Sequence, residues 1–146
     1  MKNVLIIDNS EQIKPALSDT ETNISLYIDE VQALNAVEKE QPSIVFLNYA
    51  VRNEETAEYI KLILKARIGC KIIVIADELN QEKILNCLIA GAKGYQHIKQ
   101  LDYYADKILK AIDAGEAWIT RRMVAIVIDN LRLQSTLSGI PYLDLR

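Results

Sequence analysis

The sequence predicts an α/β protein in which helices cover both faces of a parallel sheet. Two runs of Val, Ile and Leu, Val4–Ile7 and Ile72–Ile75, are apolar at every position, as expected of parallel strands buried on both faces. Such runs alternate along the chain with segments whose apolar residues recur at helical spacing. Five alternations of this kind imply right-handed crossovers within one doubly wound domain, and 146 residues suffice for its core.

In the first half of the chain each predicted strand is followed by a predicted helix. The strands are expected at 4–7, 23–28 and 44–47, and the helices at 10–17, 31–37 and 54–68. Ser10 or Asn9 could cap the first helix, because short polar side chains accept hydrogen bonds from free backbone amides. The strand at 23–28 alternates between polar and apolar residues, which favours a sheet edge. The third strand ends on a polar residue, Asn48.

The second half continues the alternation and adds one helix. The strands are expected at 72–75 and 94–98, and the helices at 80–90, 101–112 and 120–133. Asn80 is a candidate cap and Gly91 a candidate stop for the first of these helices. The last helix carries an apolar face at Met123, Val124, Val127, Ile128 and Leu131. Residues 135–146 contain Gly139 and Pro141 and are expected to form a linker or extended tail.

Composition argues against several classes of function. The net charge of −3 has both signs spread along the chain, which disfavours a general grip on nucleic acid. No apolar run approaches the roughly 20 residues that span a bilayer, and the N-terminus has no cleavage signature. Cys70 and Cys87 match no metal-binding spacing. We therefore expect a cytoplasmic protein with two reduced thiols.

Polar residues gather where the predicted strands end. The ends are Asp8 with Asn9, Asn48, Ala76 with Asp77, and Ile98 with Lys99. Because the carboxyl ends of parallel strands meet at one edge of the sheet, these residues should lie around one crevice, where open α/β sheets keep their sites.

These strand ends, together with the Gly91–Tyr95 run (GAKGY) and the Ala114–Trp118 run (AGEAW), resemble a response-regulator receiver domain. The helix after Ile119 looks like that of the LuxR/NarL-type subfamily, where it leads toward a DNA-binding domain. The resemblance implies a three-layer (βα)5 flavodoxin/CheY-like sheet of strand order 2-1-3-4-5. It also implies a receiver domain at 1–119, a linker helix at 120–134 and a tail at 135–146. No helix-turn-helix fits after 134, so DNA would be contacted only through a possible downstream domain.

In receivers of this kind an acidic pair after the first strand helps to bind Mg²⁺, and an Asp ending the third strand accepts a phosphoryl group. The carboxylate is the nucleophile, and the acids and the metal neutralise charge on the transferred group. A Thr or Ser after the fourth strand and a Lys after the fifth bind its oxygens. An aromatic residue on the fifth strand acts as a rotameric switch.

Only Asp8 and Tyr95 match the family at these positions. The departures are Asn9 for the second acid, Asn48 for the phospho-acceptor, Ala76 for the hydroxyl, and Ile98 for the Lys, with Lys99 one residue late. Side chains alternate along a strand, so Lys99 should face away from the crevice unless a bulge corrects it. An Asn amide is a poor nucleophile, so no acyl phosphate is expected. Mg²⁺ binding should be weak or absent, with Asp8 the residual candidate ligand.

The resemblance therefore implies a phosphorylation-independent receiver, not an enzyme, that acts through a protein partner or a homodimer. The candidate contact surfaces are the fifth predicted helix, the last helix, and the face formed by the fourth helix and fifth strand. The apolar residues of the last helix favour a homodimer. One alternative is a conventional receiver with Asn48 an altered acceptor, and another is a flavodoxin-like small-ligand binder. Plainer roles stay open for single residues. Asp8 could cap a helix, Tyr95 could be a half-buried strand aromatic with its hydroxyl in water, and His97 could be a surface histidine.

Overall fold

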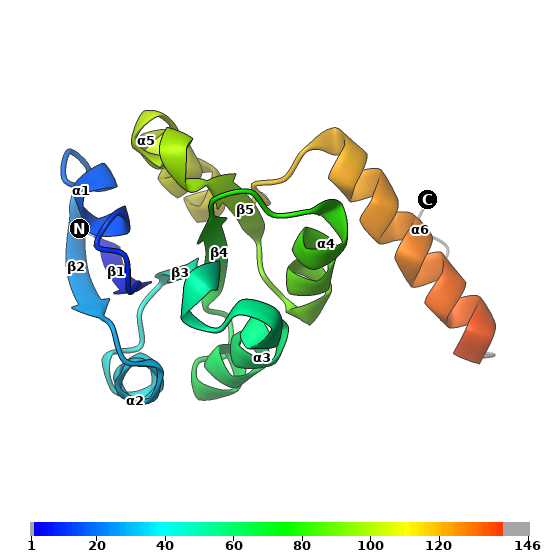
Figure 1. The fold of residues 1–146 in the computed structure, drawn as a ribbon, viewed down its shortest axis with the longest axis horizontal. Helices are drawn as coiled ribbons and strands as arrows, with labels where there is room; N and C mark the ends of the chain where they lie inside the picture. Colours follow the sequence, from blue (N-terminus) through cyan, green and yellow to red (C-terminus); the bar gives the residue numbers. More distant parts are fainter. Residues whose placement is uncertain (1, 139–146) are drawn as a thin grey trace.

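A computed structural model describes residues 2–138 and has a five-stranded parallel sheet in the order β2-β1-β3-β4-β5 (Figure 1). This confirms the predicted fold class and strand order. The strands are β1 Lys2–Ile7, β2 Thr22–Tyr27, β3 Ile44–Asn48, β4 Lys71–Ala76 and β5 Gly94–His97. As predicted, the second strand lies at an edge, and β1, β3 and β4 lie inside the sheet.

Helices cover both faces of this sheet (Figure 1). The α-helices are α1 Ile13–Ala16, α2 Glu30–Glu40, α3 Thr56–Ala66, α4 Gln81–Ala90, α5 Leu101–Asp113 and α6 Arg121–Ser138. Within residues 2–138 there are also the short 3-10 helices η1 Tyr49–Val51, η2 Asn53–Glu55 and η3 Ile98–Gln100. Helices α2, α3 and α4 lie on one face, and α1 and α5 lie on the other.

The apolar strands supply two cores at once. Leu5 and Ile7 of β1 pack with α2 and α3, whereas Val4 and Ile6 pack with α1 and α5. Successive side chains of a strand point to opposite faces, so a strand covered on both sides must be apolar at every position. Cys70 and Cys87 are buried in the first core as free thiols. Burial raises the pKa of each of these thiols to about 11.

Two later helices begin and end as the sequence predicts. Asn80 accepts a hydrogen bond from the Lys83 amide at 2.9 Å and caps α4. Gly91 ends the same helix at φ +122°, and a Cβ there would lie 2.4 Å from a side-chain atom of Leu64. The first helix differs from the prediction. It has four residues rather than the eight expected at 10–17, and neither Ser10 nor Asn9 is its main cap.

The segment before α6 is bound to the free edge of β5. Tyr95 donates its backbone amide to Trp118 O at 3.1 Å, and Trp118 donates to Lys93 O at 2.9 Å. Gly94 permits this approach, because a Cβ at that position would lie 2.4 Å from Trp118 O. The Trp118 indole also donates to Gln96 Oε1 at 2.9 Å. These contacts fix the point from which α6 departs.

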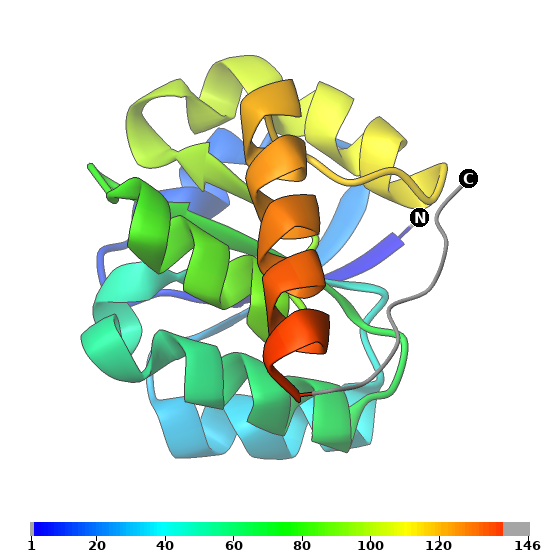
Figure 2. The same ribbon diagram turned by 90° about the vertical axis from the view of Figure 1, so that its right-hand side faces the viewer.

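Helix α6 is longer than predicted, because it continues to Ser138 instead of ending near Leu133. The sequence has no Gly or Pro stop signal before Gly139, so residues 135–138 extend the helix and are not part of a tail. The rest of the predicted tail, 139–146, lies outside the described residues. Helix α6 runs across α4 (Figure 2). No helix within 2–138 is long and apolar enough to span a membrane.

Half of the apolar face predicted for α6 is buried against the domain. Met123 is buried, and Val127 and Ile128 are half-buried. Val124 and Leu131 remain 39% and 47% exposed. The helix therefore uses part of its apolar surface to pack on α4 and leaves the rest facing outward.

Candidate functional site

The ends of β1 and β3 meet at the carboxyl edge of the sheet, as the strand order requires. Asp8 follows β1 and is fully buried, and Asn48 ends β3 and is 7% exposed. The Asn48 amide nitrogen Nδ2 donates to Asp8 Oδ1 at 2.8 Å. The structure thus brings together the two predicted site residues that lie 40 positions apart in the chain.

Asp8 accepts five hydrogen bonds, which use both of its oxygens. Oδ1 accepts from the Ser10 amide at 2.9 Å, from the Ser10 hydroxyl at 2.7 Å and from Asn48. Oδ2 accepts from the amides of Gln12 and Ile13, each at 3.1 Å. A carboxylate offers about four lone-pair sites, so Asp8 has none left. The helix-capping role considered for Asp8 is confirmed, because its Oδ2 satisfies the first amides of α1.

This environment keeps the Asp8 carboxylate ionised without a neighbouring cation. Burial on its own raises the pKa of Asp8, but the hydrogen bonds from Ser10, Asn48 and Ile13 outweigh it. The pKa of Asp8 therefore lies below its ordinary value of 3.8. Oriented N–H and O–H dipoles stabilise the buried charge, where a charged partner or a metal would otherwise be needed.

Asn48 uses both ends of its amide. Its Oδ1 accepts from the Ala50 amide at 2.9 Å, and its Nδ2 lies 3.2 Å from the Ser10 hydroxyl in addition to its bond to Asp8. One end must therefore be an acceptor and the other a donor, which fixes the orientation of the amide. A carboxylate at position 48 could accept from Ala50 but could not donate to Asp8.

The remaining groups at this edge do not fit Mg²⁺. Such a cation takes oxygen ligands in octahedral geometry, but both oxygens of Asp8 are already occupied by N–H and O–H donors. Asn9 is exposed, and its Nδ2 lies 3.5 Å from Ala50 O. Within residues 2–138 no three His, Cys, Asp or Glu side chains gather closely enough to hold a metal ion.

The ends of β4 and β5 complete the crevice but add no charge next to Asp8. Ala76 is buried at the end of β4. The fifth strand ends at His97, one residue earlier than predicted, so Ile98 and Lys99 lie in η3. Strand alternation therefore does not govern them. Ile98 packs against the core shared with α1 and α5, and Lys99 is exposed at the rim of the crevice.

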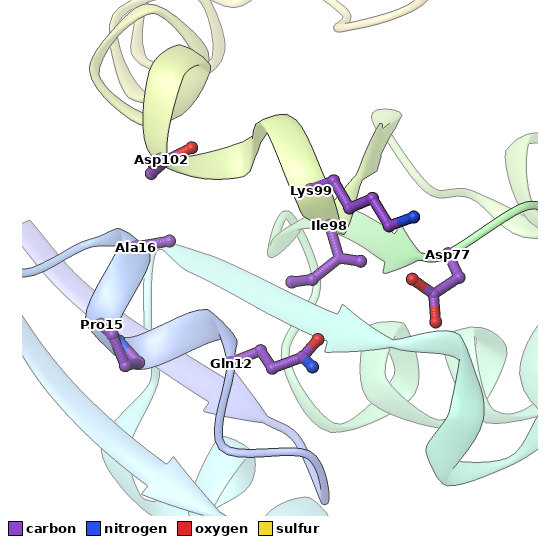
Figure 3. Close-up of a pocket in the computed structure, with 7 residues that line it drawn as sticks. All are labelled: Gln12, Pro15, Ala16, Asp77, Ile98, Lys99 and Asp102. Carbon is purple, nitrogen blue, oxygen red and sulfur yellow. The ribbon is translucent and has the colours of Figure 1, made fainter.

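An open depression lies beside this rim, and Lys99 extends across it toward Asp77 (Figure 3). Its lining residues are Gln12, Pro15, Ala16, Asp77, Ile98, Lys99 and Asp102. Lys99 forms no ion pair with any described residue. Asp8 and Asn48 do not line the depression, and both are buried. The predicted site residues therefore fall into two groups. Asp8, Asn48 and Ala76 are buried, whereas Ile98 and Lys99 line the open depression.

Tyr95 is half-buried, and its hydroxyl is hydrogen-bonded to protein. The half-buried position in β5 is as expected, and the hydroxyl also has a protein partner, because it donates to the backbone oxygen of Asp77 at 2.8 Å. Burial raises the pKa of Tyr95, and Asp77 and Glu78 raise it further. His97 is also half-buried, and its Nδ1 accepts from the Lys99 amide at 3.1 Å. Tyr95 thus connects β5 to the loop before α4.

Sequence reasoning missed Ser10, Gln12 and Ile13 as members of the site. Ser10 lies close enough in sequence to Asp8 to suggest a local turn, but the two amides that meet Oδ2 belong to backbone and carry no side-chain signature. Pro15 disfavours a helix that extends far on its N-terminal side, and the late start of α1 at Ile13 agrees with this expectation.

The fold was compared with known proteins. The isolated REC domain of RcsB from Salmonella enterica serovar Typhimurium superposes with a TM-score of 0.76 at 18% identity, over 88% of this chain and 99% of that one. A response regulator from Thermotoga maritima gives 0.67 at 24% identity, over 75% and 96%. A LuxR-family two-component response regulator from Aurantimonas sp. SI85-9A1 gives 0.73 at 15% identity, over 89% and 97%.

Sequence comparison adds nothing to this likeness, since no protein-family model and no curated protein matches the chain. The identities to the solved structures are all low, so the similarity is one of architecture. Strand order, helix placement and these superpositions agree: the chain has the CheY-like fold of response-regulator receiver domains.

Proposed function

We propose that this chain is an atypical receiver domain of a two-component response regulator that works without phosphorylation. It acts in the cytoplasm by contact with a protein partner or with a second copy of itself, and it is not an enzyme. The receiver fold and the position of Asn48 at the end of β3 support this proposal. The observation that carries it is the hydrogen bond from the Asn48 amide to a fully occupied Asp8.

The chemistry of that hydrogen bond explains why phosphoryl transfer is not expected. A neutral amide nitrogen whose lone pair is delocalised does not attack phosphorus as a carboxylate oxygen does. Both oxygens of Asp8 are occupied by donors, so Asp8 has none free to hold a cation that would offset the charge of an incoming phosphoryl group. The buried pair is instead a structural link between β1 and β3.

The same comparison suggests a place for the domain in a longer protein. We assign residues 1–119 to the receiver and, as in the LuxR/NarL-type subfamily, the following segment to a linker helix, which continues to Ser138 instead of ending at the predicted 134. In this arrangement any contact with DNA would be made by a separate DNA-binding domain after Arg146. The exposed Val124 and Leu131 of α6 are candidates for a homodimer contact, because apolar side chains at this spacing can pack against a second helix.

Intact mass spectrometry after incubation with acetyl phosphate and Mg²⁺ tests the proposal. The expected result is an unchanged mass under conditions that fully modify a conventional receiver run in parallel. A gain of one phosphoryl group that disappears in Asn48→Ala would overturn it. The variant Ser10→Ala serves as a control, since it removes a hydroxyl that contacts both Asp8 and Asn48 but leaves the side chain at position 48 unchanged.

A conventional receiver with Asn48 as an altered acceptor is the second candidate. One observation favours it, namely that Lys99 lies at the same end of the sheet with no ion pair among the described residues. This candidate predicts that Asn48→Asp gains a phosphoryl group. Our proposal predicts that it does not, because Asn9, Ala76 and Ile98 remain. A flavodoxin-like role is disfavoured, since Asp8 already occupies the first amides of α1 that would bind a phosphate.

A further inference from the structure

A second polar depression lies at the opposite, amino end of the sheet. Lys2 of β1, Lys71 of β4 and Arg67 after α3 line it, together with Ser43 and Asp113. It is partly enclosed, and all three cationic side chains are half-buried, so none extends freely into solvent. Neither the sequence analysis nor the receiver likeness assigns a role to this group.

The local charge is opposite in sign to that of the whole chain. Three cationic residues and one acidic residue line the depression, which gives a formal charge of +2 in a protein of net charge −3. Charges held close together within a recess attract a counter-ion more strongly than the same charges dispersed over a surface.

The geometry leaves cationic groups without an acidic partner. Lys2 forms an ion pair with Asp113, and Lys2 and then Lys71 contribute to lowering the pKa of that carboxyl group. Lys71 Nζ donates to Ile112 O, a carbonyl near the end of α5, at 3.0 Å. Neither Lys71 nor Arg67 has an acidic partner within 4.0 Å in the described part of the chain.

Arg67 gives the second observation that points to a ligand. Its Nε is buried and donates to no acceptor among residues 2–138, and its Nη1 makes only a 3.5 Å contact with Ile68 O. Buried donors in proteins are nearly always satisfied, and an exception indicates a water or an ion. A charged guanidinium left in this state is costly, and an anion would relieve the cost.

We propose that this depression binds the phosphate group of a small soluble molecule. Arg67 would donate to its oxygens from its planar guanidinium, and Lys71 would supply a second positive charge from the sheet. Ser43, which lines the same recess, would add a neutral donor. The site lies at the end of the sheet remote from Asp8 and Asn48, so it is independent of the proposed loss of phosphoryl transfer.

The test is a titration of the full chain with inorganic phosphate, followed by backbone amide NMR and compared with sodium chloride at equal ionic strength. Saturable shifts at Ser43, Ile68 and Lys71 are expected in the wild type. Arg67→Ala should weaken phosphate binding by at least about tenfold, as expected for a lost charge-assisted hydrogen bond. Lys14→Ala is the matched control, because it removes an exposed cation on α1 and should leave binding unchanged.

A folded state is easy to verify in the same spectra, so a failure to bind cannot be mistaken for unfolding. The proposal is overturned if phosphate and chloride cause the same shifts, or if Arg67→Ala and Lys14→Ala respond alike. A lipid phosphate has the same chemistry, so a second arm uses phosphatidylcholine vesicles with and without phosphatidic acid. Binding to the acidic vesicles without a response to free phosphate would also contradict a soluble ligand.

Discussion

The two ends of the sheet treat their polar side chains in opposite ways. At the carboxyl end, Asp8 is fully buried and accepts five hydrogen bonds from the protein itself. At the amino end, Arg67 has a buried donor with no described acceptor, and Lys71 has no acidic partner. The end where α/β folds usually bind ligands is closed, and the end that usually serves only as scaffold is open.

The polar groups at the carboxyl end of the sheet therefore stabilise the fold, whereas those at the amino end are available to bind a ligand. A buried charge that is completely hydrogen-bonded holds its neighbours together, and removing it leaves several donors unsatisfied. Cations at a rim with spare donors contribute little to folding but remain available to a ligand. Substitutions at the carboxyl end should therefore cost stability, and those at the amino end should not.

The largest effect is expected for Asp8→Ala. This change removes the acceptor shared by the Ser10, Asn48, Gln12 and Ile13 donors, and only Asn48 and Gln12 keep a contact, with the Ser10 hydroxyl. We expect the free energy of unfolding to fall by about 3 kcal/mol. Urea unfolding at pH 7, followed by circular dichroism, measures it. Asp113→Ala is the control from the amino end, where the carboxylate is exposed and paired only with Lys2. Equal losses for the two variants would remove the distinction between the ends.

The second largest loss of stability is expected for substitutions of the Asn48 side-chain amide. Asn48→Asp is the closest change in shape, but it replaces the donor to Asp8 with a second carboxylate. We expect a loss of about 2 kcal/mol at pH 7, larger than that of Asn48→Ala, because like charges repel and two acceptors cannot bond. Unfolding curves of the two variants under identical conditions decide the order. An Asn48→Asp variant as stable as the wild type would contradict the proposed role of the amide.

The stability that Asp8 contributes to the fold should also depend on pH. The pKa of Asp8 is lower in the folded state than its ordinary value of 3.8, so its ionised form stabilises the fold. That contribution is complete above about pH 4 and is lost as the pH falls through the lower pKa of the folded state. The stability difference between wild type and Asp8→Asn should therefore be constant at neutral pH and shrink in acid. A difference that grows in acid would mean that the pKa is raised.

The smallest effect is expected at the amino end. In phosphate-free buffer Lys71→Met should change the free energy of unfolding by no more than about 0.5 kcal/mol. Arg67→Ala should not lower the free energy of unfolding, because it removes a buried donor that has no described acceptor. Thermal or urea unfolding with and without phosphate measures it. Phosphate should stabilise the wild type more than either variant, because a ligand that binds only the folded state raises its stability. A large loss without phosphate would show that these cations are structural.

Much of this architecture could be predicted from sequence. The runs at Val4–Ile7 and Ile72–Ile75 must be buried on both faces, and Asn80 and Gly91 mark the ends of one helix by known capping chemistry. Asn48 was placed correctly because strand order alone brings the strand ends together.

The details that failed depend on local backbone geometry. Position 98 was assigned to a strand, but the strand ends at His97, so the expected direction of Lys99 did not apply. The occupation of Asp8 by backbone amides could not be anticipated, because amides of any residue type look alike in a sequence. The true length of α6 was missed because its polar last turn, Gln134 to Ser138, resembles a linker in composition.

Titration of the wild type with Mg²⁺ tests whether the donors around Asp8 leave an oxygen for a cation. The signals to follow are the backbone amides of Ser10 and Ile13 and the side-chain amide of Asn48. These groups all donate to Asp8, so a cation that takes an oxygen of Asp8 must displace one of them. If Asp8 has no oxygen free for a cation, Mg²⁺ should cause no saturable shift beyond that caused by sodium chloride at equal ionic strength. A saturable shift in the wild type that is absent in Asp8→Asn would contradict it.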